Sequence, residues 1–123
     1  MRGFGDLEAA IMEKLWARTR PTTVRELLPA LQANRTLAYT TVLTVVDNLY
    51  KKGWLRREPD GRAYRYSPTV TREEYGACQL RDALDDAGDP AQALVRFVEK
   101  MSAAETAALR QALAAHEDRG AAP

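Results

Sequence analysis

The middle of the chain carries three threonines followed by four long cationic side chains. Thr40, Thr41 and Thr44 fall on or beside one face of a segment with helical periodicity. A threonine hydroxyl can hydrogen-bond several bases and its methyl group can contact thymine, so these three are predicted to contact base edges in a major groove. Long cations reach phosphate, and the residues predicted to bind it are Lys51, Lys52, Arg62 and Arg65.

A helix must position the threonines. The apolar residues Val42, Val45, Val46 and Leu49 have the i, i+3, i+4, i+7 spacing of one buried helical face, and the threonines lie opposite or flank it. Gly53 supplies a left-handed stop after the two lysines. The first residue of this helix is predicted to follow a cap at Ala38 or Thr36.

A β-hairpin follows this helix directly. Residues 54–58 and 63–68 read as strands, and the turn 59–62 contains Asp-Gly, a strong hairpin signal. A helix with a short polar face and an arginine-bearing hairpin form the layout of a winged helix-turn-helix. The alternative is an ordinary surface helix and hairpin whose threonines and lysines are merely solvated.

Two helices are expected before this segment. The first runs from Leu7 to Arg18 after a cap at Asp6, with Trp16 in the core. A capping box, Thr23 to Glu26, opens the second. Pro29 removes a backbone donor, so a kink or an early end is predicted there, followed by a turn over 33–37.

The last third of the chain is predicted to be helical and to dimerise. Capping signals predict helices over roughly 72–87, 90–101 and 103–118. These short, alanine-rich helices bury too little to be stable alone, so a homodimer is expected. The alternative is that they fold back onto the first domain. The residues predicted to form the shared core are Leu80, Leu84, Leu94, Val98, Leu109 and Leu113.

The fold class is therefore mainly α with a small β-hairpin wing: a winged helix-turn-helix domain over 1–68 and a helical dimerisation region over 69–123. The formal net charge of the 123 residues is only +1, but it is unevenly distributed. Residues 1–68 hold 12 Lys and Arg against 7 Asp and Glu, and residues 69–123 hold 6 against 10. A basic module beside an acidic one indicates a nucleic-acid partner for the first.

The sequence contains few residues that could support catalysis or metal binding. Cys78 is the only cysteine and His116 the only histidine, so neither a catalytic triad nor a zinc site is expected. Cys78 is predicted to be a buried structural residue. No phosphate loop or hydrolase motif occurs, and neither a signal peptide nor a membrane span is found. The prediction is a cytoplasmic protein that is not an enzyme and needs no cofactor or metal.

Several motifs resemble those of the penicillinase repressors, the BlaI/MecI group with its CopY-type copper-repressor siblings. The similarity covers nearly the whole chain. The matching motifs are Gly5-Asp6-Leu7-Glu8, Leu15-Trp16, Thr23-Val24-Arg25-Glu26-Leu27, Ala38-Tyr39-Thr40-Thr41-Val42, Lys52-Gly53, Gly61-Arg62-Ala63-Tyr64-Arg65-Tyr66 and Leu94-Val95-Arg96-Phe97-Val98-Glu99-Lys100.

The resemblance implies a homodimeric repressor on a palindromic double-stranded operator, controlling β-lactamase or related resistance genes. The family's Tyr-Thr-Thr pattern adds Tyr39 to the predicted base contacts. In the β-lactam branch a membrane-bound sensor metalloprotease triggers cleavage of the repressor, which implies a site near Arg96 and Phe97. Staphylococcal members have Asn-Phe there, so this chain departs from their pattern. It also lacks the Cys-x-Cys pairs of the copper branch.

Two other functions fit part of the sequence. A small molecule could regulate a winged-helix protein by binding between the domain and the dimerisation helices. A winged-helix module could also bind only other proteins. The basic first half argues against the second alternative, because an interaction module has no need of it.

Overall fold

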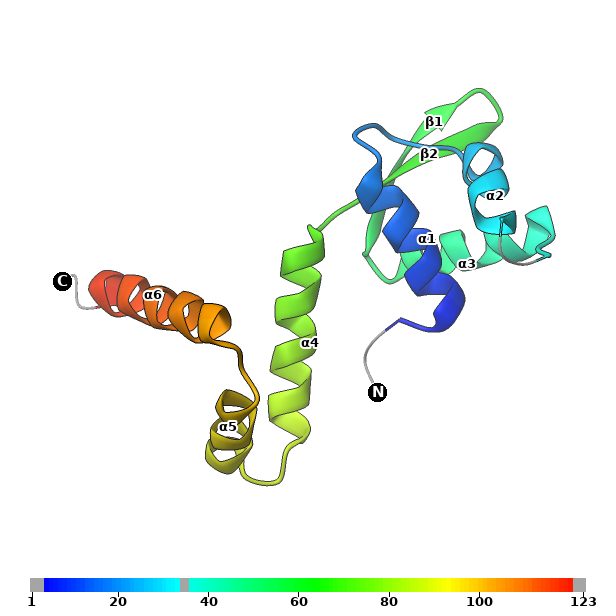
Figure 1. Ribbon diagram of the computed structural model, residues 1–123. Helices are drawn as coiled ribbons and strands as arrows, with labels where there is room; N and C mark the ends of the chain where they lie inside the picture. The colour runs from blue at the N-terminus through cyan, green and yellow to red at the C-terminus, as the bar shows by residue number, and fades with distance from the viewer. Residues whose placement is uncertain (1–3, 34–35, 121–123) are drawn as a thin grey trace. The chain divides into compact units, whose positions relative to one another are not determined.

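The chain folds as two compact units that share one helix. The computed structural model describes residues 4–33 and 36–120, and Figure 1 shows its helices and strands in order along the chain. One unit extends to Gln79 and the other starts at Leu80. The division lies inside α4 (Arg72–Asp86), so the first unit includes the opening turns of that helix as well as the wing.

Three helices open the first unit, and local signals set where each begins. Gly5 occupies the N-cap position of the first helix, so Asp6 is its first residue rather than its cap. The Thr23 hydroxyl accepts a hydrogen bond from the Glu26 amide at 3.1 Å, which confirms the capping box predicted there. The helices are α1 (Asp6–Ala17), α2 (Val24–Gln32) and α3 (Tyr39–Lys51).

The predicted early end of α2 at Pro29 is wrong, and of the two predicted starts of α3 the one after Ala38 is confirmed. Helix α2 continues through Pro29 to Gln32, because the buried Leu27 and Leu31 on either side of the proline hold it against the core. Helix α3 begins at Tyr39 with Ala38 at the N-cap position, so Thr36 is not its start. The predicted turn over 33–37 includes residues 34–35, which lie outside the described part of the chain.

The hairpin consists of β1 (Leu55–Asp60) and β2 (Ala63–Pro68), paired antiparallel with Asp60 opposite Ala63. The connecting turn therefore has only two residues, Gly61 and Arg62, and is shorter than the predicted turn over 59–62. Gly61 has φ = +62°, and a glycine at the first central position is typical of a type II′ hairpin turn.

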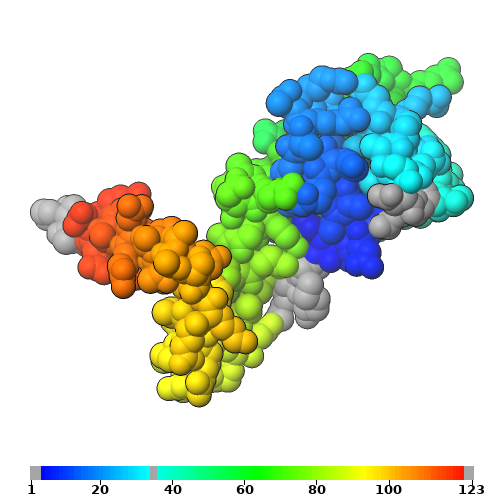
Figure 2. Space-filling model, viewed as in Figure 1, coloured from blue at the N-terminus to red at the C-terminus, as the bar shows by residue number. Residues whose placement is uncertain are grey.

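One core holds the three helices and the hairpin together. The predicted valine stripe is confirmed at Val42, Val46 and Leu49, whereas Val45 is only half-buried. Trp16 is half-buried at the edge of the core, with its ring N–H donating to the Val70 carbonyl at 2.9 Å. Figure 2 shows the blue atoms of α1 against the cyan atoms of α2. The buried apolar residues are Ile11, Met12, Leu15, Val24, Leu27, Leu31, Val42, Val46, Leu49, Leu55 and Tyr66.

Two backbone hydrogen bonds between Thr22 and Tyr66 attach the hairpin to the segment before α2. The Thr22 amide donates to the Tyr66 carbonyl at 2.9 Å, and the Tyr66 amide donates back at 2.8 Å. Both residues are buried. The base of the hairpin is therefore fixed to the helical core, which gives the wing a defined origin.

The second unit consists of the end of α4, α5 (Pro90–Glu99) and α6 (Ala103–Gly120). The predicted caps are confirmed, since the Asp89 carboxylate accepts from the Gln92 amide and the Ser102 hydroxyl accepts from the Glu105 amide. None of the described residues of α4, α5 and α6 is buried. Their helical character follows from local signals, whereas their apolar stripes remain accessible.

Cys78 is exposed, which contradicts the prediction of a buried structural cysteine. The physical reason is that no residue of α4 is buried, so the apolar character of Cys78 does not place it inside a core. Among the described residues no group of His, Cys, Asp and Glu has the arrangement of a metal site. No helix within those residues is long and apolar enough to cross a membrane.

Candidate nucleic-acid interface

The outer face of α3 presents the predicted base-contacting residues to solvent. Thr40, Thr41 and Thr44 are exposed, and Tyr39 at the start of the helix is 38% exposed. The Thr44 hydroxyl donates to the Thr40 carbonyl at 2.9 Å, which leaves its lone pairs and methyl group for an outside partner. The face is therefore short, polar and held on a helix whose opposite side is fixed in the core.

A groove of about 750 Å³ separates this face from the hairpin. Tyr39, Leu43 and Thr44 line it from α3, and residues 62–66 line it from the wing. The first turn of α2 contributes Arg25 and other residues to the same surface. Helix α3 and the wing thus form two walls of one concave surface.

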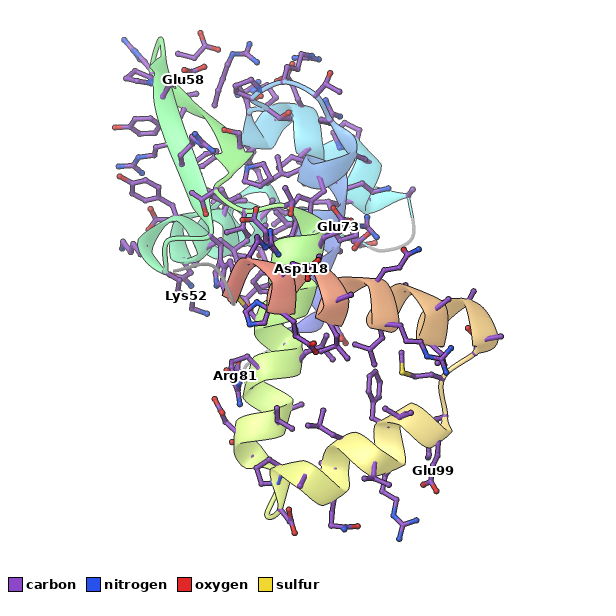
Figure 3. The ribbon with its side chains drawn as sticks, turned by 90° about the vertical axis from the view of Figure 1, so that its left-hand side faces the viewer. Lys52, Glu58, Glu73, Arg81, Glu99 and Asp118 are labelled. Atoms are coloured by element: carbon purple, nitrogen blue, oxygen red, sulfur yellow. The ribbon has the colours of Figure 1, made fainter. Side chains whose placement is uncertain are left out.

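The two lysines at the end of α3 already have acidic partners. The ammonium of Lys51 lies 3.0 Å from Asp47, one helical turn earlier. That of Lys52 lies 3.0 Å from Glu8 of α1, and this lysine is labelled beyond the end of α3 in Figure 3. Both lysines are more than half exposed, so their pairs are weak and can exchange for phosphate.

The two wing arginines that were predicted to bind phosphate differ in their surroundings. Arg62 is exposed at the turn and has no ion pair within the described part of the chain. Arg65 lies 3.0 Å from Glu26 and 2.9 Å from Asp60, and only a third of its side chain is exposed. Of these two residues, Arg62 is thus the one more available to phosphate, whereas Arg65 also connects the wing to α2.

Glu26 is the acidic residue at the centre of this connection. Its carboxylate accepts from the Thr23 amide at 3.0 Å and pairs with Arg20 and Arg65. The Thr23 hydrogen bond and the two arginines together lower the pKa of Glu26 to about 2, against the raising effect of desolvation. Glu26 of the α2 capping box therefore also binds Arg65 of the wing. Its place in a capping box does not predict this second role.

The structure brings together a second arginine cluster that the sequence analysis did not predict. The guanidinium carbon of Arg57 lies 4.0 Å from the ring centroid of Tyr50 on one side and of Tyr64 on the other. One Arg57 nitrogen also lies 3.6 Å from Asp47. Strand alternation places Arg57 and Tyr64 on one face of the hairpin, and that signal could have identified half of the cluster.

Four aromatic rings attach the opening turns of α4 to the rest of the first unit. Phe4 stacks on Tyr75 with their centroids 4.2 Å apart, and the Phe4 amide donates to the Tyr75 hydroxyl at 2.9 Å. Trp54 meets both rings edge-on at 5.3 Å, and Trp16 lies beside them. This cluster, also absent from the sequence-based predictions, explains why the first compact unit extends beyond the wing.

The sequence is similar to known repressors over most of its length. Residues 4–115 match the penicillinase repressor family. The transcriptional regulator BlaI of Mycobacterium tuberculosis is 50% identical over 113 residues, which cover 89% of this chain and 82% of that protein. A penicillinase repressor of Bacillus licheniformis is 29% identical over 70 residues, covering 57% of this chain and 54% of that protein.

The fold is also similar to a solved structure. The solution structure of the DNA-binding domain of the repressor BlaI aligns with a TM-score of 0.52 and 26% identity, covering 58% of this chain and 87% of that domain. With the two-stranded hairpin placed after three helices, this similarity confirms the predicted winged helix fold.

Proposed function

The chain belongs to the penicillinase repressor family, whose named relatives are transcriptional regulators, and we propose that it represses transcription by binding a palindromic DNA operator as a homodimer. The observation that carries this proposal is the exposed threonine face of α3 beside the groove that leads to the wing. A buried apolar face fixes α3 from behind, so the threonines are presented on a rigid support.

In the proposed complex α3 enters the major groove. Tyr39, Thr40, Thr41 and Thr44 contact base edges, because a helix of this size fits that groove and threonine can address several bases. Lys51, Lys52 and Arg62 bind phosphates, which sets the register of the protein on the duplex. Arg65 contributes charge near the same surface while it holds the wing.

Replacing Thr44 with alanine tests the base-reading part of the proposal. Thr44→Ala should weaken binding to the duplex that the wild-type protein enriches from a randomised pool by about 1–3 kcal/mol, and weaken binding to a scrambled duplex far less. Fluorescence anisotropy over a range of salt concentrations measures both. Equal losses on the two duplexes would show that Thr44 reads no base.

Dimerisation is assigned to the second unit. Leu80, Leu94, Val98 and Leu113 are between 43% and 60% exposed, and Leu84 and Leu109 are half-buried. When a second copy covers exposed apolar side chains, their removal from water lowers the free energy and favours association. A dimer also matches the proposed palindrome, since two-fold protein symmetry corresponds to two half-sites.

Release is proposed to occur by proteolysis near Arg96 and Phe97, triggered by a membrane-bound sensor protease. Phe97 is 49% exposed, and α5 has no buried residue, so little tertiary packing opposes local opening of this helix. Co-expression with the sensor and a β-lactam should yield a fragment ending at Arg96. Intact repressor together with derepressed target genes would exclude this mechanism.

The proposed targets are β-lactamase or related resistance genes. The relative in Bacillus licheniformis is named a penicillinase repressor, and the chain shares its family. Deleting the gene should raise β-lactamase transcripts, measured by quantitative PCR, and supplying it on a plasmid should restore repression. Unchanged transcripts would assign the repressor to other genes.

A further inference from the structure

Arg57 lies on β1 at the edge of the core, where it is only partly buried. At the base of the hairpin, Leu55 and Tyr66 are 2% exposed and pack among the helices. Two residues farther along β1 the same face carries Arg57, which the register places directly opposite Tyr66. On this face of β1, the side chain after the buried Leu55 is therefore a cation rather than another apolar residue.

The surroundings of Arg57 hold its guanidinium plane in place. The rings of Tyr50 and Tyr64 lie on its two sides, each with its centroid 4.0 Å from the guanidinium carbon. A planar guanidinium stacks on aromatic faces in a way that a lysine ammonium cannot reproduce. Asp47, at 3.6 Å, partly balances the charge. Only 27% of the Arg57 side chain is exposed.

This cluster joins the two walls of the groove. Tyr50 and Asp47 belong to α3, whereas Arg57 and Tyr64 belong to the two strands of the wing. Arg57, Tyr64 and Asp47 also line the groove itself. The distance between the recognition helix and the wing therefore depends on contacts that Arg57 makes in both directions.

We propose that Arg57 is a positioning residue that sets the spacing between α3 and the wing, so that Arg62 reaches the DNA backbone while the threonines of α3 read the adjacent bases. This inference rests on the proposed DNA-binding function. Arg57 acts through Arg62: its own guanidinium is occupied by two rings and a carboxylate, whereas Arg62 at the turn is exposed.

The first test compares Arg57→Ala with Arg57→Lys on the duplex that the wild-type protein enriches from a randomised pool. Both variants should bind about tenfold more weakly than wild type, because neither side chain can stack between two rings. Arg56→Ala is the matched control: Arg56 is exposed on the same strand with its side chain on the opposite face, and its loss should change affinity much less. Wild-type affinity of Arg57→Lys would overturn the proposal.

The second test separates positioning from direct phosphate contact. Removing one phosphate contact lowers the slope of log affinity against log salt by about one. Arg57→Ala should lower the slope in the wild-type background and should lower it no further in the Arg62→Ala background. An additional fall in the double variant would make Arg57 a phosphate ligand and overturn the positioning role.

Two further measurements separate a folding defect and a failure of the proposed function from a failure of this inference. Thermal unfolding shows whether each variant folds. If Arg57→Ala does not fold, affinity and salt slope are measured instead on Arg57→Lys and on the double variant Arg57→Lys, Arg62→Ala. Wild-type protein that enriches no duplex from the randomised pool would overturn the proposed function together with this inference. Wild-type binding that Arg57→Ala leaves unchanged would overturn this inference alone.

Discussion

The two compact units differ in what their apolar side chains contact. In the first unit, three helices and a hairpin direct residues such as Ile11, Leu27 and Leu49 into one core from which solvent is excluded. In the second, the described helices bury no residue, and Leu80 is 60% exposed. Because apolar burial is the dominant favourable term in folding, the first unit has its own source of stability, whereas we infer that the second obtains it from another copy of the chain.

The first and last parts of the sequence also differ in net charge. Residues 1–68 carry a formal balance of +5 and residues 69–123 one of −4. The proposed work is divided accordingly: the basic part binds the polyanion, and the acidic part supplies the second half-site through dimerisation. Four predictions test this division of roles.

The largest effect is expected from Leu109→Asp in α6. A charge in the proposed dimer core should give monomers in sedimentation, and loss of the tether between two half-sites should weaken operator binding by roughly 10²–10⁴-fold. Gln111→Asp, at an exposed position of the same helix, is the matched control and should remain dimeric. If the wild-type protein sediments as a monomer at micromolar concentration, a second copy does not stabilise the second unit, and the proposed difference between the two units is wrong.

A pair of leucine truncations should separate the units by stability. Leu49→Ala creates a cavity in the core of the first unit and should lower its free energy of unfolding by about 2–5 kcal/mol. Leu113→Ala, at a side chain that is 50% exposed, should leave the unfolding of the first unit unchanged and instead raise the dissociation constant of the dimer. Denaturant unfolding followed by tryptophan fluorescence measures the first effect, since Trp16 and Trp54 both lie in that unit. Similar losses for the two variants would mean that the units do not fold independently.

Arg62 and Arg65, the wing arginines predicted to bind phosphate, should respond differently to replacement. Arg62→Ala should lower the slope of log affinity against log salt by about one and leave thermal stability unchanged. Arg65→Ala should lower the slope less and reduce the melting temperature, because its partners Glu26 and Asp60 lose their cation. Equal slopes with equal melting temperatures would contradict the assignment of different roles to these residues.

The smallest effect is expected from the pH dependence at Glu26. Its pKa is about 2 in the folded protein against an ordinary value of 4.5, so the ionised carboxylate favours the folded state above pH 4.5. This contribution is lost as pH falls from 4.5 towards 2. Glu26→Gln should therefore flatten the acid limb of the stability curve of the first unit, measured by urea unfolding. Glu58→Gln, on the wing and labelled in Figure 3, is the control for removing one carboxylate and should flatten it less.

Features that depend on neighbours along the chain could be predicted from the sequence. The capping boxes at Thr23 and Ser102 fix helix starts through residues three positions apart, and the valine stripe of α3 follows from helical periodicity. The Asp-Gly signal located the hairpin, although the register shortened the turn. These signals also carried the winged helix fold, because its recognition helix and wing are consecutive in the sequence.

Tertiary structure alone decided the contacts between residues distant in the sequence. Phe4 donates to Tyr75 across 71 positions, and Arg65 pairs with Glu26 across 39, separations at which no local pattern specifies a partner. Cys78 is exposed because no residue of α4 is buried, which is a property of the whole arrangement rather than of the residue. The sequence could thus supply the polar face of α3. Which wing arginine pairs with Glu26 of α2, and which one lies between two tyrosines, depends on how β1 and β2 pack against α2 and α3.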